Sequence, residues 1–211
     1  SKLQESHRRV QWVYGSTNND ELEERYDQWA ADYDSDLAAE FAWNSPQHAS
    51  DVFAKHVSKL AKILDAGAGT GLVGECLAEA GYKDLVAMDL SQGMLDEAKK
   101  KNIYNDFRQM ALGASLDFPS NAFDSVISVG VFTQGHAPVN SFDELIRITR
   151  PAGIIVFSLR VDTYENDGFK EYQADLEDAG KWKLVEVTDQ FQPLPKGEPE
   201  VWHQIWAYQV S

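Results

Sequence analysis

The sequence predicts an α/β protein built on a doubly wound, seven-stranded and mostly parallel sheet, with a helical cap before it. Two observations lead to this prediction. Short apolar runs alternate with amphipathic segments over residues 61–211, which is typical of a parallel sheet between helices. The last two runs, near residues 182–188 and 201–210, are joined by a proline-rich loop alone, so we expect them to pair antiparallel.

The residues before the predicted sheet divide into two parts. Residues 1–20 are mostly polar, and we expect a flexible arm there. Residues 21–211 are expected to form one domain, in which 21–60 is the helical cap and 61–211 the core. The cap begins with apolar residues at steps of three and four, which share one helix face: Leu22, Tyr26, Trp29 and Tyr33. The aromatic side chains of this helix either cover a site as a lid or only pack on the core.

A glycine-rich turn follows the first predicted strand. Gly67, Gly69 and Gly71 stand at alternate positions, which lets the backbone bend sharply and lets a ligand lie against it. The helix expected over residues 72–79 adds free N–H groups and the positive end of its dipole. Ligands of doubly wound sheets bind where the strands end, so we predict a nucleotide-like cofactor here. The alternative is a turn that binds nothing.

The spacing of the glycines indicates which cofactor this turn accepts. The dinucleotide fingerprint needs a glycine where the chain has Leu72, which disfavours a nicotinamide-dependent oxidoreductase but leaves it as an alternative. Asp65 ends the first predicted strand and Asp89 ends the second. The second carboxylate stands at roughly the 20-residue separation expected of a ribose-binding acid.

This arrangement resembles motif I and the following acidic motif of class I S-adenosylmethionine-dependent methyltransferases. Residues 26–34 resemble the aromatic cap of many small-molecule methyltransferases, and residues 147–153 resemble the family's turn before the fifth strand, with Ala152 replacing a glycine. More narrowly, the aromatic cap, residues 129–132 and the arginine-containing end of the fifth predicted strand resemble the Williams–Beuren-region methyltransferase-like group. The resemblance covers about residues 21–210. It implies the Rossmann-like class I fold, S-adenosylmethionine as the cofactor and S-adenosylhomocysteine as the product.

The resemblance also implies roles for residues around the turn. Asp89 would accept hydrogen bonds from both ribose hydroxyls, since a carboxylate has lone pairs for two donors. Asp65 would reach the cofactor's ammonium group directly or through water, and Leu90 and Met94 would flank adenine. Residues 109–113 lack the acid that many relatives use for adenine, so backbone groups or Asp117 would hold it. The expected cofactor contacts are Tyr33, Asp65, Gly67, Gly69, Thr70, Gly71, Asp89, Leu90, Met94, Ala111, Leu112 and Val129.

The methyl acceptor is expected beyond the fourth and fifth strands. His136 is either a general base, since the usual pKa of histidine is near neutral pH, or a histidine of the loop without a chemical role. Arg160 either holds a substrate carboxylate or forms a surface salt bridge. The expected substrate contacts are Phe132, Gln134, Arg160 and Tyr164. The histidines lack the spacing of metal ligands, so no metal site is predicted.

Composition narrows the classes of substrate and compartment. The net charge is −15, which argues against a nucleic-acid substrate because phosphates would be repelled. The sequence has no Pro-Pro and no Pro-Cys dipeptide, so the motifs of nucleobase amino-group and cytosine-C5 methylases are missing. The single cysteine, Cys76, and the lack of an apolar N-terminal segment or membrane span lead us to expect a cytoplasmic protein. The sequence leaves the oligomeric state open.

Methyl transfer requires mainly that two reactants be positioned and desolvated, and the cofactor supplies the leaving group. A catalytic triad or a metal is therefore not needed. We expect an S-adenosylmethionine-dependent methyltransferase that acts on a small molecule. Because few residues could act as a base, a non-catalytic S-adenosylmethionine-binding module, such as a sensor or a partner subunit, is the alternative.

Overall fold

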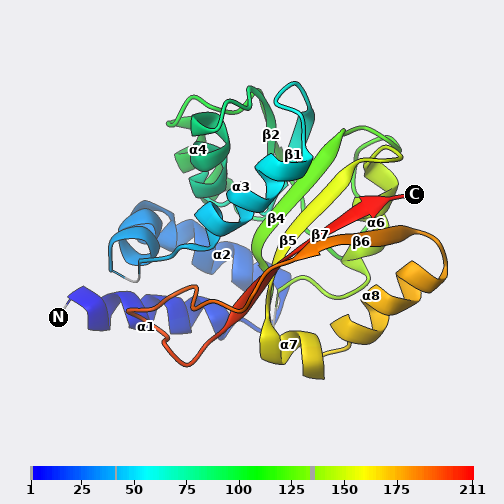
Figure 1. The fold of residues 1–211 in the computed structure, drawn as a ribbon. Coiled ribbons are helices and arrows are strands. Elements are labelled where there is room, and N and C mark those ends of the chain that lie inside the picture. Colours follow the sequence, from blue (N-terminus) through cyan, green and yellow to red (C-terminus); the bar gives the residue numbers. More distant parts are fainter. Residues whose placement is uncertain (1, 41, 134–135) are drawn as a thin grey trace.

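The computed structural model describes residues 2–40, 42–133 and 136–211 and shows one seven-stranded sheet with helices on both faces (Figure 1). The strand order is β3-β2-β1-β4-β5-β7-β6. Strands β1 to β5 are parallel, whereas β7 is antiparallel to both β5 and β6. This confirms the predicted mostly parallel sheet. The strands are β1 (Lys62–Ala66), β2 (Asp84–Asp89), β3 (Asp106–Gln109), β4 (Ser125–Phe132), β5 (Ile154–Arg160), β6 (Trp182–Val187) and β7 (His203–Val210).

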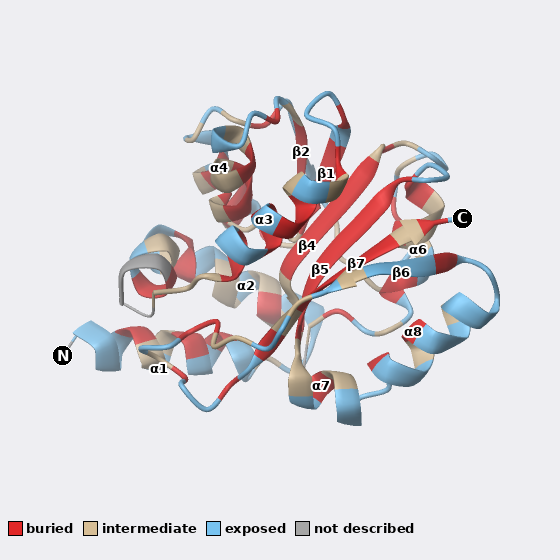
Figure 2. Cartoon of the chain, in the orientation of Figure 1, coloured by how far each residue is buried: buried red, intermediate tan, exposed pale blue. Residues whose placement is uncertain are grey.

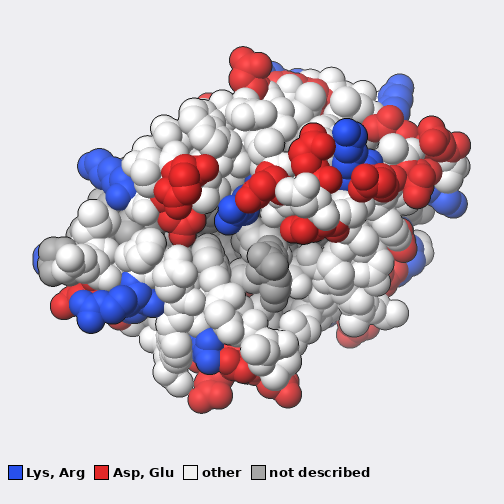
Figure 3. Space-filling view, turned by 90° about the horizontal axis from the view of Figure 1, so that it is seen from below, with Lys and Arg blue, Asp and Glu red and all other residues white. Residues whose placement is uncertain are grey.

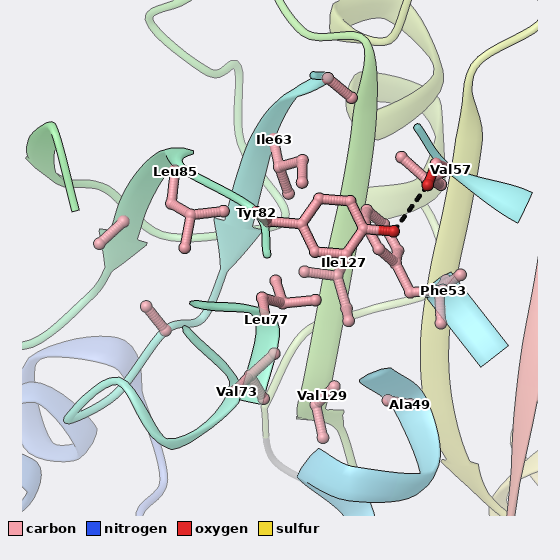
Figure 4. Packing of buried hydrophobic residues seen from close by; sticks show 14 of the residues in the cluster. Ala49, Phe53, Val57, Ile63, Val73, Leu77, Tyr82, Leu85, Ile127 and Val129 are labelled. Carbon is pink, nitrogen blue, oxygen red and sulfur yellow. Dashed lines mark hydrogen bonds between the residues drawn. The ribbon is translucent and has the colours of Figure 1, made fainter. Parts of the chain in front are cut away.

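Successive strand side chains enter two different apolar layers, because they point to opposite faces of the sheet. Ile63 packs with helices α3, α4 and α5, and Leu64 packs with α6 and α8 on the other face. Figure 4 shows the first layer, where the Tyr82 hydroxyl donates a hydrogen bond to the Val57 carbonyl over 2.6 Å. The central strands are buried along most of their length (Figure 2). The helices are α3 (Ser45–His56), α4 (Leu72–Glu79), α5 (Gln92–Lys99), α6 (Ser141–Ile148), α7 (Val161–Asn166) and α8 (Phe169–Asp178).

The N-terminal cap contains more helix than the sequence suggests. Its elements are α1 (Lys2–Tyr14), α2 (Asn19–Trp29), a 3-10 turn (Ala30–Asp32) and a π-helix (Ser35–Glu40). The expectation of a flexible arm over residues 1–20 is not what the structure shows, because most of this stretch is α1. Val10 and Val13 on this helix are fully buried. The helix therefore packs as part of the cap, beneath α2 in Figure 1.

A buried acid fixes α1 to the rest of the cap. The Asp36 carboxylate accepts hydrogen bonds from the Ser6 hydroxyl, Arg9 Nε and Trp29 Nε1, each over 2.6 Å. Burial raises the pKa of Asp36, but the hydrogen bonds from Arg9, Ser6 and Trp29 outweigh burial and leave this pKa lowered. The charge is thus paired and fully hydrogen-bonded, which a buried ion requires.

Two local features depart from the usual form of their motifs. Ser141 and Glu144 have the spacing of a helix capping box, but the box does not form: the Ser141 hydroxyl has no partner among the described residues, and Glu144 accepts from the Leu116 N–H and pairs with Arg147. Ala152 stands where the turn of the resembling family has a glycine. Its φ of 69° lies in the left-handed region, which glycine adopts without strain, so the turn would favour glycine here.

Candidate functional site

The glycine turn lies at the carboxyl ends of β1 and β2, beside β4. Gly67 and Gly69 have φ of 80° and 57°, and the N–H groups of Gly67 and Ala68 both donate to the Met88 carbonyl, at 2.8 and 2.9 Å. A Cβ built on Gly67 would lie 2.2 Å from a methyl carbon of Val131. Only glycine fits there, because the β4 end presses against the turn.

Asp89 lies across this turn and ends β2. Its carboxylate accepts the Gly69 N–H over 2.8 Å with one oxygen and the Ser91 N–H over 2.9 Å with the other. Burial raises the pKa of Asp89 to about 6, so the group is mostly ionised at pH 7. Each oxygen can accept a further hydrogen bond. Two adjacent hydroxyl groups of a ligand therefore match its remaining capacity.

A first cavity of about 90 Å³ opens at these strand ends. Nine of the residues expected to contact a cofactor line it, together with His136: Tyr33, Gly67, Gly69, Asp89, Leu90, Met94, Ala111, Leu112 and Val129. The structure thus brings together, from four strand ends and the cap, side chains that are far apart in sequence. The cavity is smaller than the ~300 Å³ usual for a small-molecule site.

Tyr33 is one reason why the first cavity is narrow. The ring of Tyr33 covers Gly69, where a Cβ would lie 3.8 Å from it, and it packs edge-on against Trp29 and Trp43. Asp34 follows Tyr33 and accepts a hydrogen bond from the Thr70 hydroxyl. The cap therefore closes directly on the glycine turn.

The other end of the cap is held by the beginning of α5. Asp27 accepts hydrogen bonds from the Ser91 hydroxyl and, over 2.8 Å, from the Gly93 N–H. A Cβ on Gly93 would approach the Asp27 backbone to 3.0 Å. The two aspartates, Asp27 and Asp34, thus attach the cap to both loops that border the first cavity.

Three of the expected cofactor contacts do not line the cavity: Asp65, Thr70 and Gly71. Asp65 is fully buried; one oxygen accepts the Tyr104 hydroxyl over 2.5 Å and the other has no partner among the described residues. Burial raises the pKa of Asp65 to about 7, and the hydrogen bond from Tyr104 opposes this increase. Asp65 thus has no surface on the first cavity.

A second cavity of about 410 Å³ adjoins the first and shares Tyr26, Tyr33 and Gly130 with it. Its walls come from the cap, from the ends of β4 and β5, and from the loop between β6 and β7. Arg160 lines it, and its guanidinium binds both Asp162 oxygens, at 2.8 and 2.7 Å. The rest of its lining includes Tyr14, Trp43, Thr133, Glu198 and His203.

His136 lies between the rings of Tyr14 and Tyr26, whose centroids are 5.4 and 5.8 Å from its own. Burial lowers the pKa of His136 to about 4, so the imidazole is neutral at pH 7. Its Nε2 is buried without a partner among the described residues. The histidine is well placed to hydrogen-bond a ligand, but it is a weaker proton acceptor than its usual pKa implies.

The expected substrate contacts are only partly brought together. Phe132 is fully buried among Phe142, Phe157 and Phe169, so that expectation is wrong: the side chain has no surface to offer a ligand. Tyr164 packs on Trp206 and lines neither cavity. Arg160 does line the second cavity, and Gln134 lies outside the described residues.

Comparisons with known proteins agree with this architecture. A model of the methyltransferase domain matches residues 64–157. Methyltransferase-like protein 27 of Homo sapiens is 33% identical over 189 residues, which are 86% of this chain and 76% of the relative. The chain belongs to the class I S-adenosylmethionine-dependent methyltransferases. An uncharacterized methyltransferase of Schizosaccharomyces pombe is 30% identical over 168 residues, 70% of this chain and 57% of that relative.

A solved structure shows the same fold. A putative methyltransferase of Haloferax volcanii, in complex with the activator Trm112, aligns with a TM-score of 0.65 over 86% of this chain and 96% of that one, at 18% identity. Because the chain belongs to the S-adenosylmethionine-dependent methyltransferases, its cofactor is S-adenosylmethionine, and the residues present fit it. Asp89 has acceptor capacity for ribose hydroxyls, and the glycine turn leaves no Cβ in the way of the amino-acid arm.

Neither a metal-binding cluster nor a membrane-spanning helix occurs in the described part of the chain. No group of three or more His, Cys, Asp or Glu residues in the described ranges is placed to hold a metal ion. Among the same residues, no helix is long and apolar enough to cross a membrane. Basic side chains form no continuous patch over the described part of the face in Figure 3, where acidic side chains stand between them.

The sequence did not indicate several residues of the second cavity. Tyr14 lies on the helix that was expected to be an arm. Glu198 lies within the proline-rich loop, which carries no periodic signal, and His203 begins the strand after that loop. Trp43 precedes α3 and reaches Gly130, where a Cβ would approach its ring to 3.1 Å. Long-range packing, which periodicity does not encode, places these residues beside the methyltransferase's cofactor cavity.

Proposed function

We propose that this methyltransferase transfers the methyl group of S-adenosylmethionine to a small organic molecule bound in the second cavity. The observation that carries the proposal is the shared wall of the two cavities, Tyr26, Tyr33 and Gly130. A methyl group held at this wall would face the second cavity. A volume of about 410 Å³ suits a small molecule, for which sites of ~300–1,000 Å³ are usual.

Each part of the first cavity has a role in this proposal. Asp89 binds the ribose hydroxyls, and the backbone of Gly67 and Gly69 lies against the amino-acid arm. Leu90 and Met94 cover the adenine ring. The remaining expected contacts, Ala111, Leu112 and Val129, complete its apolar wall. Asp65 does not line the cavity, and its unpaired oxygen would accept a hydrogen bond from an ordered water under the ammonium group.

The proposed chemistry depends on exclusion of water more than on acid–base groups. The sulfonium supplies the methyl group, and its positive charge disappears as the carbon–sulfur bond breaks. The cap rings around Tyr33 would shield that step from water, which strengthens the electrostatic effects of the site. The low pKa of His136 suits a hydrogen-bonding residue that positions the acceptor.

A non-catalytic S-adenosylmethionine-binding module is the second candidate. It is favoured by the lowered pKa of His136, the histidine that lines the first cavity, because a histidine with a low pKa is a weak general base. The deciding experiment incubates the protein with S-adenosylmethionine labelled in the methyl group and a fractionated metabolite extract. The proposal requires label in a small-molecule product and stoichiometric S-adenosylhomocysteine, both lost in Asp89→Ala. Tight cofactor binding with no labelled product in any fraction would favour the module.

A further inference from the structure

The second cavity contains a buried acid, Glu198, that forms no ion pair with the described residues. Glu198 is 8% exposed, and its carboxylate forms no hydrogen bond or ion pair with any described residue, whereas the guanidinium of Arg160 is bonded to Asp162 through two nitrogen atoms. Burial raises the pKa of Glu198, and the nearby Arg160 and His7 only partly oppose this effect. A buried carboxylate is costly without a partner, so this one favours a ligand that brings a positive charge.

The surroundings of Glu198 suit an organic cation. Tyr14, Tyr26, Tyr33 and Trp43 line the same cavity, and aromatic rings attract ammonium groups through their faces. Two more polar atoms of the cavity, Thr133 Oγ1 and His203 Nδ1, are buried without a partner in the described part of the chain. Burial lowers the pKa of His203 to about 4, so it is neutral at pH 7 and its ring can accept a hydrogen bond through one nitrogen.

We propose that the acceptor molecule carries a protonated amine, which binds to Glu198 inside this aromatic cavity. The inference rests on the proposed function, since it assigns the substrate class of the same site. The net charge of −15 agrees with it, because a strongly negative protein attracts cations and repels anions. Arg160 does not reverse the preference, since its guanidinium is paired with Asp162.

The test compares three probes of the same shape and different charge on protein saturated with S-adenosylhomocysteine. Phenethylamine is the cation, 2-phenylethanol the neutral probe and 3-phenylpropionate the anion, each titrated by calorimetry. We expect phenethylamine to bind at least tenfold more tightly than the other two. Glu198→Gln should remove that preference and leave 2-phenylethanol unaffected. The matched control is Glu200→Gln, at an exposed acid two residues away, which should change no affinity more than twofold.

Several outcomes would overturn the inference. Equal affinity for the amine and the alcohol would show that charge does not matter, and preference for 3-phenylpropionate that is lost in Arg160→Gln would show an anion site. Failure of all three probes to bind, in protein that still binds S-adenosylhomocysteine and labels a metabolite, would refute the amine and leave the proposed function standing. If the wild-type protein did not bind S-adenosylhomocysteine, the proposed function itself would be refuted. In Glu198→Gln, unchanged S-adenosylhomocysteine affinity serves as the check on folding.

Discussion

Replacement of Asp89 by alanine probes the cofactor site most sharply. The carboxylate holds the turn through the Gly69 and Ser91 N–H groups and retains one free lone-pair direction on each oxygen. In our account those two directions receive the ribose hydroxyls. Asp89→Ala removes both acceptors at once, while the strand that carries them stays paired on both sides with β1 and β3.

The size of the effect follows from the number of bonds lost. Hydrogen bonds to a charged acceptor contribute about 1.5–3 kcal/mol each. Because water can enter the space left by the carboxylate and restore part of this, we expect a net loss of about 2–4 kcal/mol for two bonds. That loss corresponds to a rise of roughly 30- to 700-fold in the dissociation constant of S-adenosylhomocysteine.

Calorimetric titration of S-adenosylhomocysteine measures this effect, with circular dichroism as the check that the variant is folded. The matched control is Asp84→Ala, at the other end of the same strand, where the carboxylate meets Asn105 over 3.1 Å; its affinity should stay within threefold of wild type. Wild-type affinity should also fall as the pH drops through about 6, the raised pKa of Asp89, because protonation removes an acceptor. A folded Asp89→Ala protein with unchanged affinity would refute the assignment of the ribose to this residue.

Three further predictions follow. S-adenosylmethionine and S-adenosylhomocysteine should bind and NADH should not, because Leu72 replaces the glycine that a dinucleotide needs. Tight binding of NADH, with no binding of either adenosyl compound, would contradict S-adenosylmethionine as the cofactor. Hydrogen exchange of residues 21–40 should slow when S-adenosylhomocysteine is added, and Tyr33→Ala should weaken that ligand more than it lowers the apo melting temperature; equally slow exchange without ligand would make the cap a fixed part of the core. Asp65→Asn should stabilise the apo protein increasingly from pH 4 to pH 8 in denaturant titrations. Burial raises the pKa of Asp65 from 3.8 to about 7, so its charge opposes folding above that pH by up to about 4 kcal/mol, and asparagine keeps an acceptor for Tyr104; a difference independent of pH would contradict this.

Features decided by neighbouring residues could be predicted from the sequence. The helix after the turn begins at Leu72 and ends at Glu79 as expected, because Gly71 adopts the left-handed conformation that starts it. Ser91 caps α5 through its hydroxyl, which accepts the Met94 N–H over 3.1 Å. In both cases the signal lies within four residues of the feature.

Features decided by distant contacts could not be predicted in this way. Glu144 has the sequence spacing of a capping residue, but in the folded protein its carboxylate accepts the Leu116 N–H, 28 residues away. The helix α1 is stabilised by Asp36, which takes its hydrogen bonds from Ser6 and Arg9 across about thirty residues. The position of Glu198 in the second cavity likewise depends on how a long loop folds back.

A structure of the protein with S-adenosylhomocysteine tests the central claim most directly. The account predicts both ribose hydroxyl oxygens within hydrogen-bonding distance, about 2.5–3.0 Å, of the Asp89 carboxylate, and the amino-acid arm over Gly67 and Gly69. It also predicts that the Tyr33 ring moves off Gly69, because the first cavity of about 90 Å³ is too small for the ligand. A ribose bound away from Asp89, or a ligand accommodated with Tyr33 still on Gly69, would contradict it.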